Sequence, residues 1–134
     1  MTDAPAPTVW PCLGYDDAPA AIAFLTALGF TEHLVVPGED GSDVAHAELA
    51  WPEGGAVMMS SAAAKQGPFA ARPTGAGSAY VVTDDPHAVL ARATALGAPI
   101  VAGMRDEDYG STGFSLADPE GNLWSFGTYR GQPA

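Results

Sequence analysis

The sequence contains a single cysteine, Cys12, so it can form neither an internal disulfide nor a cluster of cysteine ligands around zinc. Basic residues are also scarce: five Lys and Arg stand against 16 Asp and Glu, which gives a net charge of −11. Because so few cations cannot neutralise a polyanion, we expect no nucleic-acid partner. The negative charge favours a cationic ligand or partner at long range, and it equally serves solubility.

No apolar run approaches the roughly 20 residues that a membrane-spanning helix needs, so we expect no membrane partner. The N-terminal segment MTDAPAPTV has neither the basic region nor the apolar stretch of a secretory signal, which predicts a cytoplasmic protein. The nucleotide-binding motifs GxGxxG and GxxxxGK[ST] do not occur. No GxSxG motif surrounds Ser111, Ser115 or Ser125, which argues against a serine hydrolase.

The most informative feature present is an internal repeat. Residues 16–29, DDAPAAIAFLTALG, align without gaps with residues 84–97, DDPHAVLARATALG, and eight of the 14 positions are identical. The offset of 68 residues is about half of the 134-residue chain, which indicates two copies of one structural unit. Alanine-rich helices can resemble each other by chance, but the shared Asp-Asp start and Thr-Ala-Leu-Gly end favour a true repeat.

Each copy of the repeat reads as a strand followed by a helix. Residues 8–15 are apolar and predict a strand that leads into Asp16 and Asp17. Either aspartate can accept hydrogen bonds from the free amides of the first helical turn. Apolar residues at helical spacing follow, and Gly29 can adopt the left-handed conformation that ends a helix.

Further strands and turns complete both halves. In the first half, strands are predicted at residues 30–36, 44–51 and 55–60. In the second half, we predict a strand at 78–83, a helix at 86–96, and strands at 100–103, 113–118 and 123–129. The sequence therefore predicts a single α+β domain over residues 1–134, with a βαβββ unit at 8–61, an Ala-, Gly- and Pro-rich linker at 62–77 and a second βαβββ unit at 78–130.

Two βαβββ units with a DPEGN turn before the final strand resemble the vicinal oxygen chelate superfamily, which contains glyoxalases, bleomycin resistance proteins and extradiol dioxygenases. PCLGYDDAPAAIAFLTALGF is similar to the opening strand and helix of that family, and DYGSTGFSLADPEGNLWSFGTY to its closing hairpin. The resemblance covers nearly the whole chain. It implies that each unit curls into half a barrel, and that the two half-barrels enclose a cavity, often in a homodimer.

In the metalloenzymes of this family, four His, Glu or Gln side chains bind a catalytic metal ion. The resemblance places Trp10, Glu48, Ser78 and Ser125 at these positions. A catalytic site needs about three protein donors, tryptophan does not coordinate metals, and a neutral serine is a poor ligand. We therefore expect no metal ion and no other cofactor, and we assign no catalytic residue.

His46 keeps a metal site open as an alternative. It lies two residues from Glu48, and alternate residues of a strand share a face. The pair could bind an ion with a third donor, or Glu48 could act as a general base with His46 as its partner. The simpler interpretation makes both of them polar residues of a cavity wall. Cys12 could likewise be a nucleophile near His46, or a buried and inert packing residue.

Strand alternation predicts which side chains line the cavity. The expected ligand-binding residues on the strands are Trp10, Cys12, His46, Glu48, Ser78, Tyr80 and Ser125, and Tyr109, on the loop before the seventh strand, is expected at the mouth of the cavity. Trp124 and Phe126 alternate with Ser125 and are expected to pack beneath a helix. An aromatic residue where a metal ligand would stand favours the stacking of a flat molecule.

These observations favour a metal-free homodimer that resembles bleomycin resistance proteins. It would bind and sequester a small aromatic antibiotic or natural product, for which the net charge favours a cation, rather than catalyse a reaction. The alternative is a metal-dependent lyase, isomerase or dioxygenase of the same family with an unusual site at His46 and Glu48. A third class is a structural or regulatory module whose cavity is filled by its own side chains.

Overall fold

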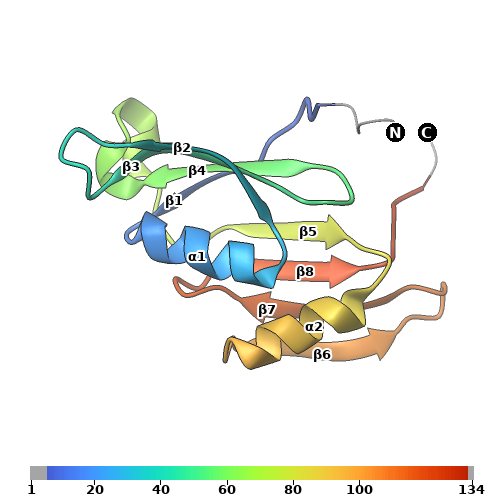
Figure 1. Cartoon of the computed structure of the whole chain (residues 1–134). Helices are drawn as coiled ribbons and strands as arrows, with labels where there is room; N and C mark the ends of the chain where they lie inside the picture. Colours follow the sequence, from blue (N-terminus) through green and yellow to red (C-terminus); the bar gives the residue numbers. More distant parts are fainter. Residues whose placement is uncertain (1–5, 133–134) are drawn as a thin grey trace.

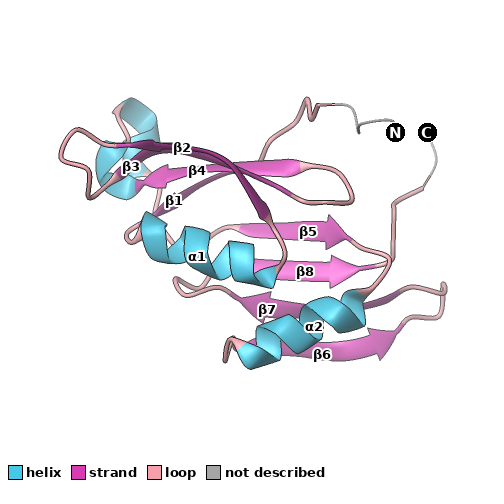
Figure 2. Cartoon of the chain, in the orientation of Figure 1, coloured by secondary structure: helices cyan, strands magenta, loops and turns pink. Residues whose placement is uncertain are grey.

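The sequence repeat corresponds to two βαβββ units in the computed structural model, which describes residues 6–132 (Figure 1). The first unit contains β1 (Cys12–Tyr15), α1 (Ala18–Leu28), β2 (Thr31–Pro37), β3 (Val44–Ala50) and β4 (Ala56–Ser61). The second unit contains β5 (Ser78–Val82), α2 (Pro86–Ala95), β6 (Ile100–Asp106), β7 (Thr112–Ala117) and β8 (Leu123–Gly127) (Figure 2). The predicted α+β class and the order of elements are confirmed.

Each unit forms its own four-stranded mixed sheet. The strand orders are β1-β4-β3-β2 and β5-β8-β7-β6, so the two sheets have the same topology. In both units the first strand pairs in parallel with the last, and Cys12 stands opposite Met58 as Tyr80 stands opposite Ser125. Neither helix in residues 6–132 is long and apolar enough to cross a membrane.

Some element boundaries differ from the prediction. β1 begins at Cys12 rather than at residue 8, because Pro11 has no N–H to donate to a sheet and only its carbonyl bonds to the amide of Met58. β6 continues to Asp106 through two shifts of register against β7. The linker contains two short 3₁₀ turns, at Ala62–Ala64 and Gly67–Ala71.

The helices begin and end at residues that the repeat shares. The second aspartate of each pair is the N-cap: Asp17 accepts a hydrogen bond of 3.1 Å from the amide of Ala20, and Asp85 one of 3.1 Å from Ala88. Gly29 follows α1 with φ of 137°, in the region that favours glycine, as predicted. The sequence had left open which aspartate acts, and the structure selects the second in both copies.

One apolar core lies between the inner faces of the two sheets, with both helices contributing to it (Figure 1). Trp124 and Phe126 of β8 are 1% and 0% exposed, which confirms that they are packed inside. Phe30 makes edge-to-face contacts with Trp51 and Trp124, with ring centroids 4.9 and 5.6 Å apart, and so joins aromatic residues of the two units. The opposite face of each sheet therefore points away from this core.

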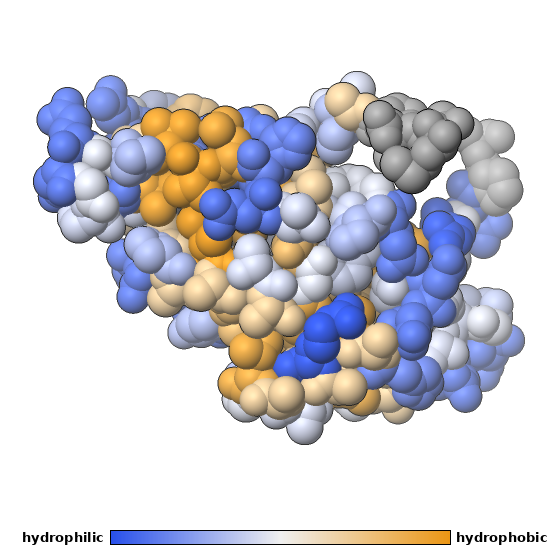
Figure 3. Space-filling model, in the orientation of Figure 1, coloured by the Kyte–Doolittle hydropathy of each residue, from blue (hydrophilic) through white to orange (hydrophobic). Residues whose placement is uncertain are grey.

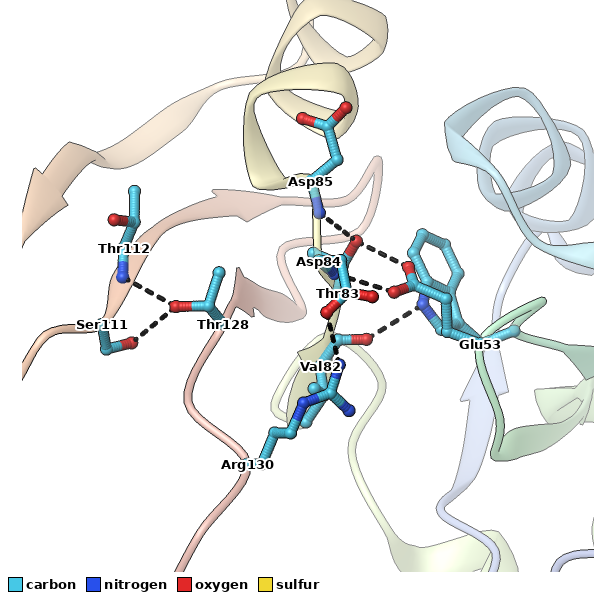
Figure 4. A network of polar contacts seen from close by, with 10 residues as sticks. Glu53, Val82, Thr83, Asp84, Asp85, Ser111, Thr112, Thr128 and Arg130 are labelled. Carbon is cyan, nitrogen blue, oxygen red and sulfur yellow. Dashed lines mark hydrogen bonds and ion pairs between the residues drawn. The ribbon is translucent and has the colours of Figure 1, made fainter.

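In each unit, a glutamate in one turn accepts hydrogen bonds from the other unit, and we call this pair of contacts the clasp. Glu120, in the turn before β8, accepts hydrogen bonds of 2.7 and 2.8 Å from the amides of Asp16 and Asp17. Glu53, in the turn before β4, accepts bonds of 2.6 and 2.8 Å from the Thr83 hydroxyl and the Asp84 amide (Figure 4). Each unit thus satisfies free donors at the start of the other unit's helix.

Beside the clasp, Asp118 is a buried carboxylate with several donors around it. It accepts hydrogen bonds from the Tyr15 hydroxyl at 2.6 Å and from the Trp124 indole at 3.1 Å. It also accepts bonds of 3.0 Å from the backbone amide and from the side-chain amide of Asn122. Burial first, and then the contact with Asp118, raises the pKa of Tyr15, so its hydroxyl stays protonated as a donor.

Candidate ligand-binding site

The side of the first sheet that faces away from the core is called the first outer face. The strand register and the alternation of burial give this face the side chains of Cys12, His46, Glu48, Met58 and Ser60, with Gly14 between them. β2 adds Leu34 and Val36, which pair with Glu48 and His46 and are 41% and 40% exposed. The face therefore combines an apolar surface with one acidic and one imidazole group.

A cavity of about 870 Å³, the first cavity, lies between the first outer face and the linker. Cys12, His46 and Met58 line it from the sheet, and Lys65 and Arg72 line it from the linker. Cys12 lines this cavity and is exposed, so it is not a buried packing residue.

Gly14 makes room for the linker on this face. A Cβ atom at Gly14 would lie 2.5 Å from Nζ and 2.6 Å from Cε of Lys65, so the lysine side chain extends across the bare backbone of β1. A larger residue at position 14 would force the end of the Lys65 side chain to shift. The lack of a side chain here therefore leaves the space that the lysine side chain occupies.

His46 and Glu48 form a pair on the first outer face. Their Nε2 and Oε2 atoms are 2.7 Å apart, and the side chains are 39% and 22% exposed. The two residues belong to β3 and point to the same side, as the i, i+2 spacing predicts. Within residues 6–132 no group of three His, Cys, Asp or Glu side chains is arranged to hold a metal ion.

The corresponding side of the second sheet, the second outer face, carries hydroxyl groups. Ser115 and Ser125 lie opposite each other on β7 and β8, with their Oγ atoms 2.7 Å apart. A cavity of about 330 Å³, the second cavity, is lined by both serines together with Tyr80, Tyr109 and Tyr129. The second cavity is therefore smaller than the first, and more aromatic rings line it.

The three tyrosines of the second cavity lie close together. The rings of Tyr109 and Tyr129 meet edge to face with centroids 5.5 Å apart. The Tyr80 hydroxyl lies over Gly127, where an added Cβ would be 2.7 Å away. Partial burial is the main cause that raises the pKa of Tyr80, so this hydroxyl is protonated near neutral pH and can donate a hydrogen bond.

The structure divides the predicted ligand-binding residues between two places. Cys12 and His46 line the first cavity, whereas Tyr80, Tyr109 and Ser125 line the second. The remaining three, Trp10, Glu48 and Ser78, border neither cavity. The Trp10 indole donates a hydrogen bond of 3.1 Å to the carbonyl of Pro7, just before β1. Because the outer faces turn away from the common core, one chain alone does not unite the predicted set.

Among the cavity residues that sequence reasoning missed are Met58, Lys65, Arg72 and Tyr129. Met58, rather than Glu48, is the counterpart of Ser125, because it pairs with β1 as Ser125 pairs with β5. A signal for this was present in the sequence: Pro-Glu-Gly occurs at 52–54 and again at 119–121, and the same offset of 67 relates Met58 to Ser125.

The sequence and the fold both match known proteins. Residues 8–126 match the family model described as the Glyoxalase/Bleomycin resistance protein/Dioxygenase superfamily. A search of curated proteins gives no significant match. Among solved structures, the chain is similar to TioX from Micromonospora sp. ML1, with a TM-score of 0.74 and 28% sequence identity over 89% of this chain and 97% of TioX.

Two further structures share the fold at lower identity. A bleomycin resistance determinant encoded on the transposon Tn5 gives a TM-score of 0.64 at 18% identity, covering 93% of this chain and 99% of the other. A lactoylglutathione lyase from Agrobacterium tumefaciens gives 0.66 at 22% identity, covering 92% and 94%. A resistance protein and a lyase are thus similar in fold to this chain, and the fold alone does not choose between binding and catalysis.

Proposed function

The chain belongs to the glyoxalase/bleomycin resistance protein/dioxygenase superfamily, and we propose that it binds and sequesters a small aromatic molecule without a metal ion. The observation that carries this proposal is the first cavity, whose volume of about 870 Å³ suits a drug-sized molecule. Its floor presents Met58 at the position symmetric with Ser125, and neither side chain is a good ligand for a catalytic metal. We propose that the ligand is an antibiotic or another natural product, and that the protein binds it in the cytoplasm.

Three of the four positions that the resemblance implies for metal binding support a metal-free site: Trp10 has no atom that coordinates a metal, and Ser78 and Ser125 are neutral hydroxyls. The fourth, Glu48, is bonded to His46 at 2.7 Å, and Met58, which the register makes the counterpart of Ser125, offers only a thioether. Ser125 is in addition hydrogen bonded to Ser115 at 2.7 Å. These residues do not fit a catalytic metal ion, and we derive no metal-dependent step from them.

Tyrosine rings supply the surface for an aromatic ligand. Tyr109 is 68% exposed, and its edge-to-face contact with Tyr129 leaves the face of one ring available for stacking. Each stacked aromatic pair contributes about 0.5–1.5 kcal/mol beyond the burial of area. The Tyr80 hydroxyl can add one hydrogen bond that fixes the orientation of the ligand.

We propose that a second copy of the chain completes the site. In a homodimer, the first outer face of one copy would close over the second outer face of the other and unite the two cavities. Exposed apolar residues support such a contact: Leu34 and Val36 flank the first outer face, and apolar atoms gather over β2 in Figure 3. Because the predicted residues are divided between two faces, a complete site would then require the dimer.

Ligand binding by the tyrosine surface can be tested by tryptophan fluorescence with a panel of aromatic natural products. For a compound that binds, Tyr109→Ala should weaken affinity by about two- to tenfold, which is the value of one stacked pair. Leu96→Ala is the matched control, because Leu96 is 40% exposed at the end of α2 and lines neither cavity. Equal affinity of the Tyr109→Ala variant and the parent for every ligand would contradict the proposal.

Mixed dimers test the shared site. His46→Ala on the first outer face and Tyr80→Ala on the second should each weaken both sites of a homodimer. A mixed dimer of the two variants should contain one site with both substitutions and one with neither, and should therefore recover tight binding at half the sites. A monomer by light scattering, or mixed dimers without recovery, would rule out a composite site.

A metal-dependent enzyme is the second candidate, and the 2.7 Å contact between His46 and Glu48 is the observation that favours it. Metal content should be measured on protein purified without chelator, before and after incubation with Fe(II), Mn(II), Ni(II) and Zn(II). About one ion per chain, lost in Glu48→Gln, would favour the enzyme. Weak binding of every metal, unaffected by Glu48→Gln, would leave the metal-free binding protein.

A further inference from the structure

We infer that the ligand of the first cavity carries an anionic group, a carboxylate or an equivalent, that Lys65 and Arg72 bind. This inference rests on the proposed function and names the chemical class of its ligand. It also reverses the expectation drawn from the net charge of −11, which favours a cation. The net charge acts at long range, whereas side chains within hydrogen-bond reach decide which charge a cavity accepts.

The five cationic side chains divide into two groups by their partners. Arg92 donates to the carbonyl of Leu28 at 2.8 Å, Arg105 pairs with Glu107 at 2.8 Å, and Arg130 pairs with Asp84. Lys65 and Arg72 are the other two, and within residues 6–132 neither has an ion pair or a side-chain hydrogen bond. The two cations without a partner are both lining residues of the first cavity.

The lining of the first cavity contains no acidic residue that could neutralise these cations. Glu48 lies on the same outer face but is engaged with His46 at 2.7 Å. Asn122, which also lines the cavity, is engaged as well, because it bonds to Asp118 and to the amide of Gly77. In a chain with 16 Asp and Glu, the exclusion of carboxylates from this one lining leaves a local positive charge.

The backbone places both cationic residues at the ends of the 3₁₀ turns of the linker. Lys65 is the C-cap of the 3₁₀ turn Ala62–Ala64, with its amide bonded to the carbonyl of Ala62 at 3.1 Å. Arg72 is the C-cap of the turn Gly67–Ala71, with its amide bonded to Phe69 at 3.2 Å. Each cation therefore closes one turn of the linker.

The first cavity also has an apolar floor. Cys12 and Met58 supply apolar side chains on the sheet side of the cavity. An aromatic ring that packs on them would place an acidic substituent beside Lys65 and Arg72 of the linker. A guanidinium binds a carboxylate through two parallel hydrogen bonds, and an ammonium adds a point charge.

Three probes with one ring system and different charge test the inference: naphthalene-2-carboxylate, naphthalene-2-carboxamide and 2-(aminomethyl)naphthalene. Titrations followed by ¹H–¹⁵N NMR report weak affinities and show which amides shift. We expect the carboxylate to bind at least about tenfold more tightly than the amide, and the amine least tightly. Lys65→Gln and Arg72→Gln should each reduce the carboxylate–amide difference severalfold and leave the affinity for the amide unchanged.

Arg130→Gln is the matched control, because it removes the same charge outside both cavities and should leave the carboxylate–amide difference intact. The inference is overturned if carboxylate and amide bind alike, or if Arg130→Gln reduces the difference as much as Arg72→Gln. If the amide still binds in the first cavity, the proposed function survives that failure. If none of the three probes shifts resonances of residues 58–77, the proposed function fails together with the inference.

Discussion

The two units share their topology and their clasp, but they differ on the faces that turn away from the core. The first outer face carries the His46–Glu48 pair beneath a cationic linker, whereas the second carries serine hydroxyls and tyrosine rings. Between the sheets, both units supply buried apolar side chains to one core. The difference teaches that stability lies in the core and the clasp, which leaves the outer faces free to diverge toward binding.

Next to the clasp, two further contacts join the units with opposite hydrogen-bond polarity. Trp51 precedes the first Pro-Glu-Gly turn and donates its indole N–H to the carbonyl of Val82 at 3.1 Å. Asp118 precedes the second and accepts from the Tyr15 hydroxyl at 2.6 Å. The first unit therefore reaches across with a donor, and the second with an acceptor whose charge is buried.

The largest expected effect comes from breaking the charged side of this comparison with Asp118→Asn. The new amide would face the Tyr15 hydroxyl and the Trp124 indole, which are donors, so we expect a loss of about 3 kcal/mol in the free energy of unfolding. Urea denaturation at neutral pH measures it. Asp108→Asn, at an exposed position, is the control, and equal stability of both variants would show that the buried carboxylate is unimportant.

Tyr15→Phe removes the donor to the same carboxylate and should cost about 2 kcal/mol at neutral pH. The pKa of Tyr15 is raised above its ordinary 10.0, so at alkaline pH the unfolded chain releases a proton that the folded chain retains. The parent therefore loses stability as the pH rises above 10.0, and the variant lacks this loss. The difference between them should narrow at about pH 10.5. A constant difference in urea unfolding at both pH values would argue against a raised pKa.

Glu53→Gln and Glu120→Gln sharpen the comparison by testing whether the two clasp contacts are equivalent. Each carboxylate accepts two hydrogen bonds and each amide would keep one acceptor, so we expect losses of about 1 kcal/mol per variant. The double variant should lose the sum, because the two residues share no partner. Thermal or urea unfolding measures all three, with Glu39→Gln as an exposed control. A neutral effect at one glutamate would show an asymmetric clasp.

The smallest effect is expected on an outer face. Ser125→Ala removes a hydrogen bond of 2.7 Å to Ser115 at a half-exposed position, so stability should change by less than about 0.5 kcal/mol. The same urea experiment measures this change. A loss as large as that of the clasp variants would make the second outer face a structural element rather than a binding surface.

Local signals in the sequence predicted much of the fold. Asp17 and Asp85 cap the helices because a carboxylate bonds the first free amides, and Gly29 ends α1 because it can take a positive φ. The clasp was not predicted, because Glu53 and Glu120 bind residues of the other unit that are far away in sequence. Contacts of this kind depend on how the two sheets pack, which periodicity does not report.

The candidate site was predicted in part for the same physical reasons. Strand alternation placed His46 and Glu48 on one side of β3, and Tyr80 and Ser125 on one side of their sheet. Lys65 was missed because the linker has no hydrophobic period that indicates which side chains face inward. The division of the site between two faces was also missed, since it follows from the packing of both sheets against one core.

The reciprocity of the clasp bears on how such a chain can arise. Glu53 binds the amide of Asp84 as Glu120 binds the amide of Asp16, so the halves are joined by one kind of contact made in both directions. Two identical polypeptides, each a single unit, can form the same pair of contacts with each other. Tandem duplication then needed only a connecting segment, and the connector that resulted, residues 62–77, now carries both cations that line the first cavity.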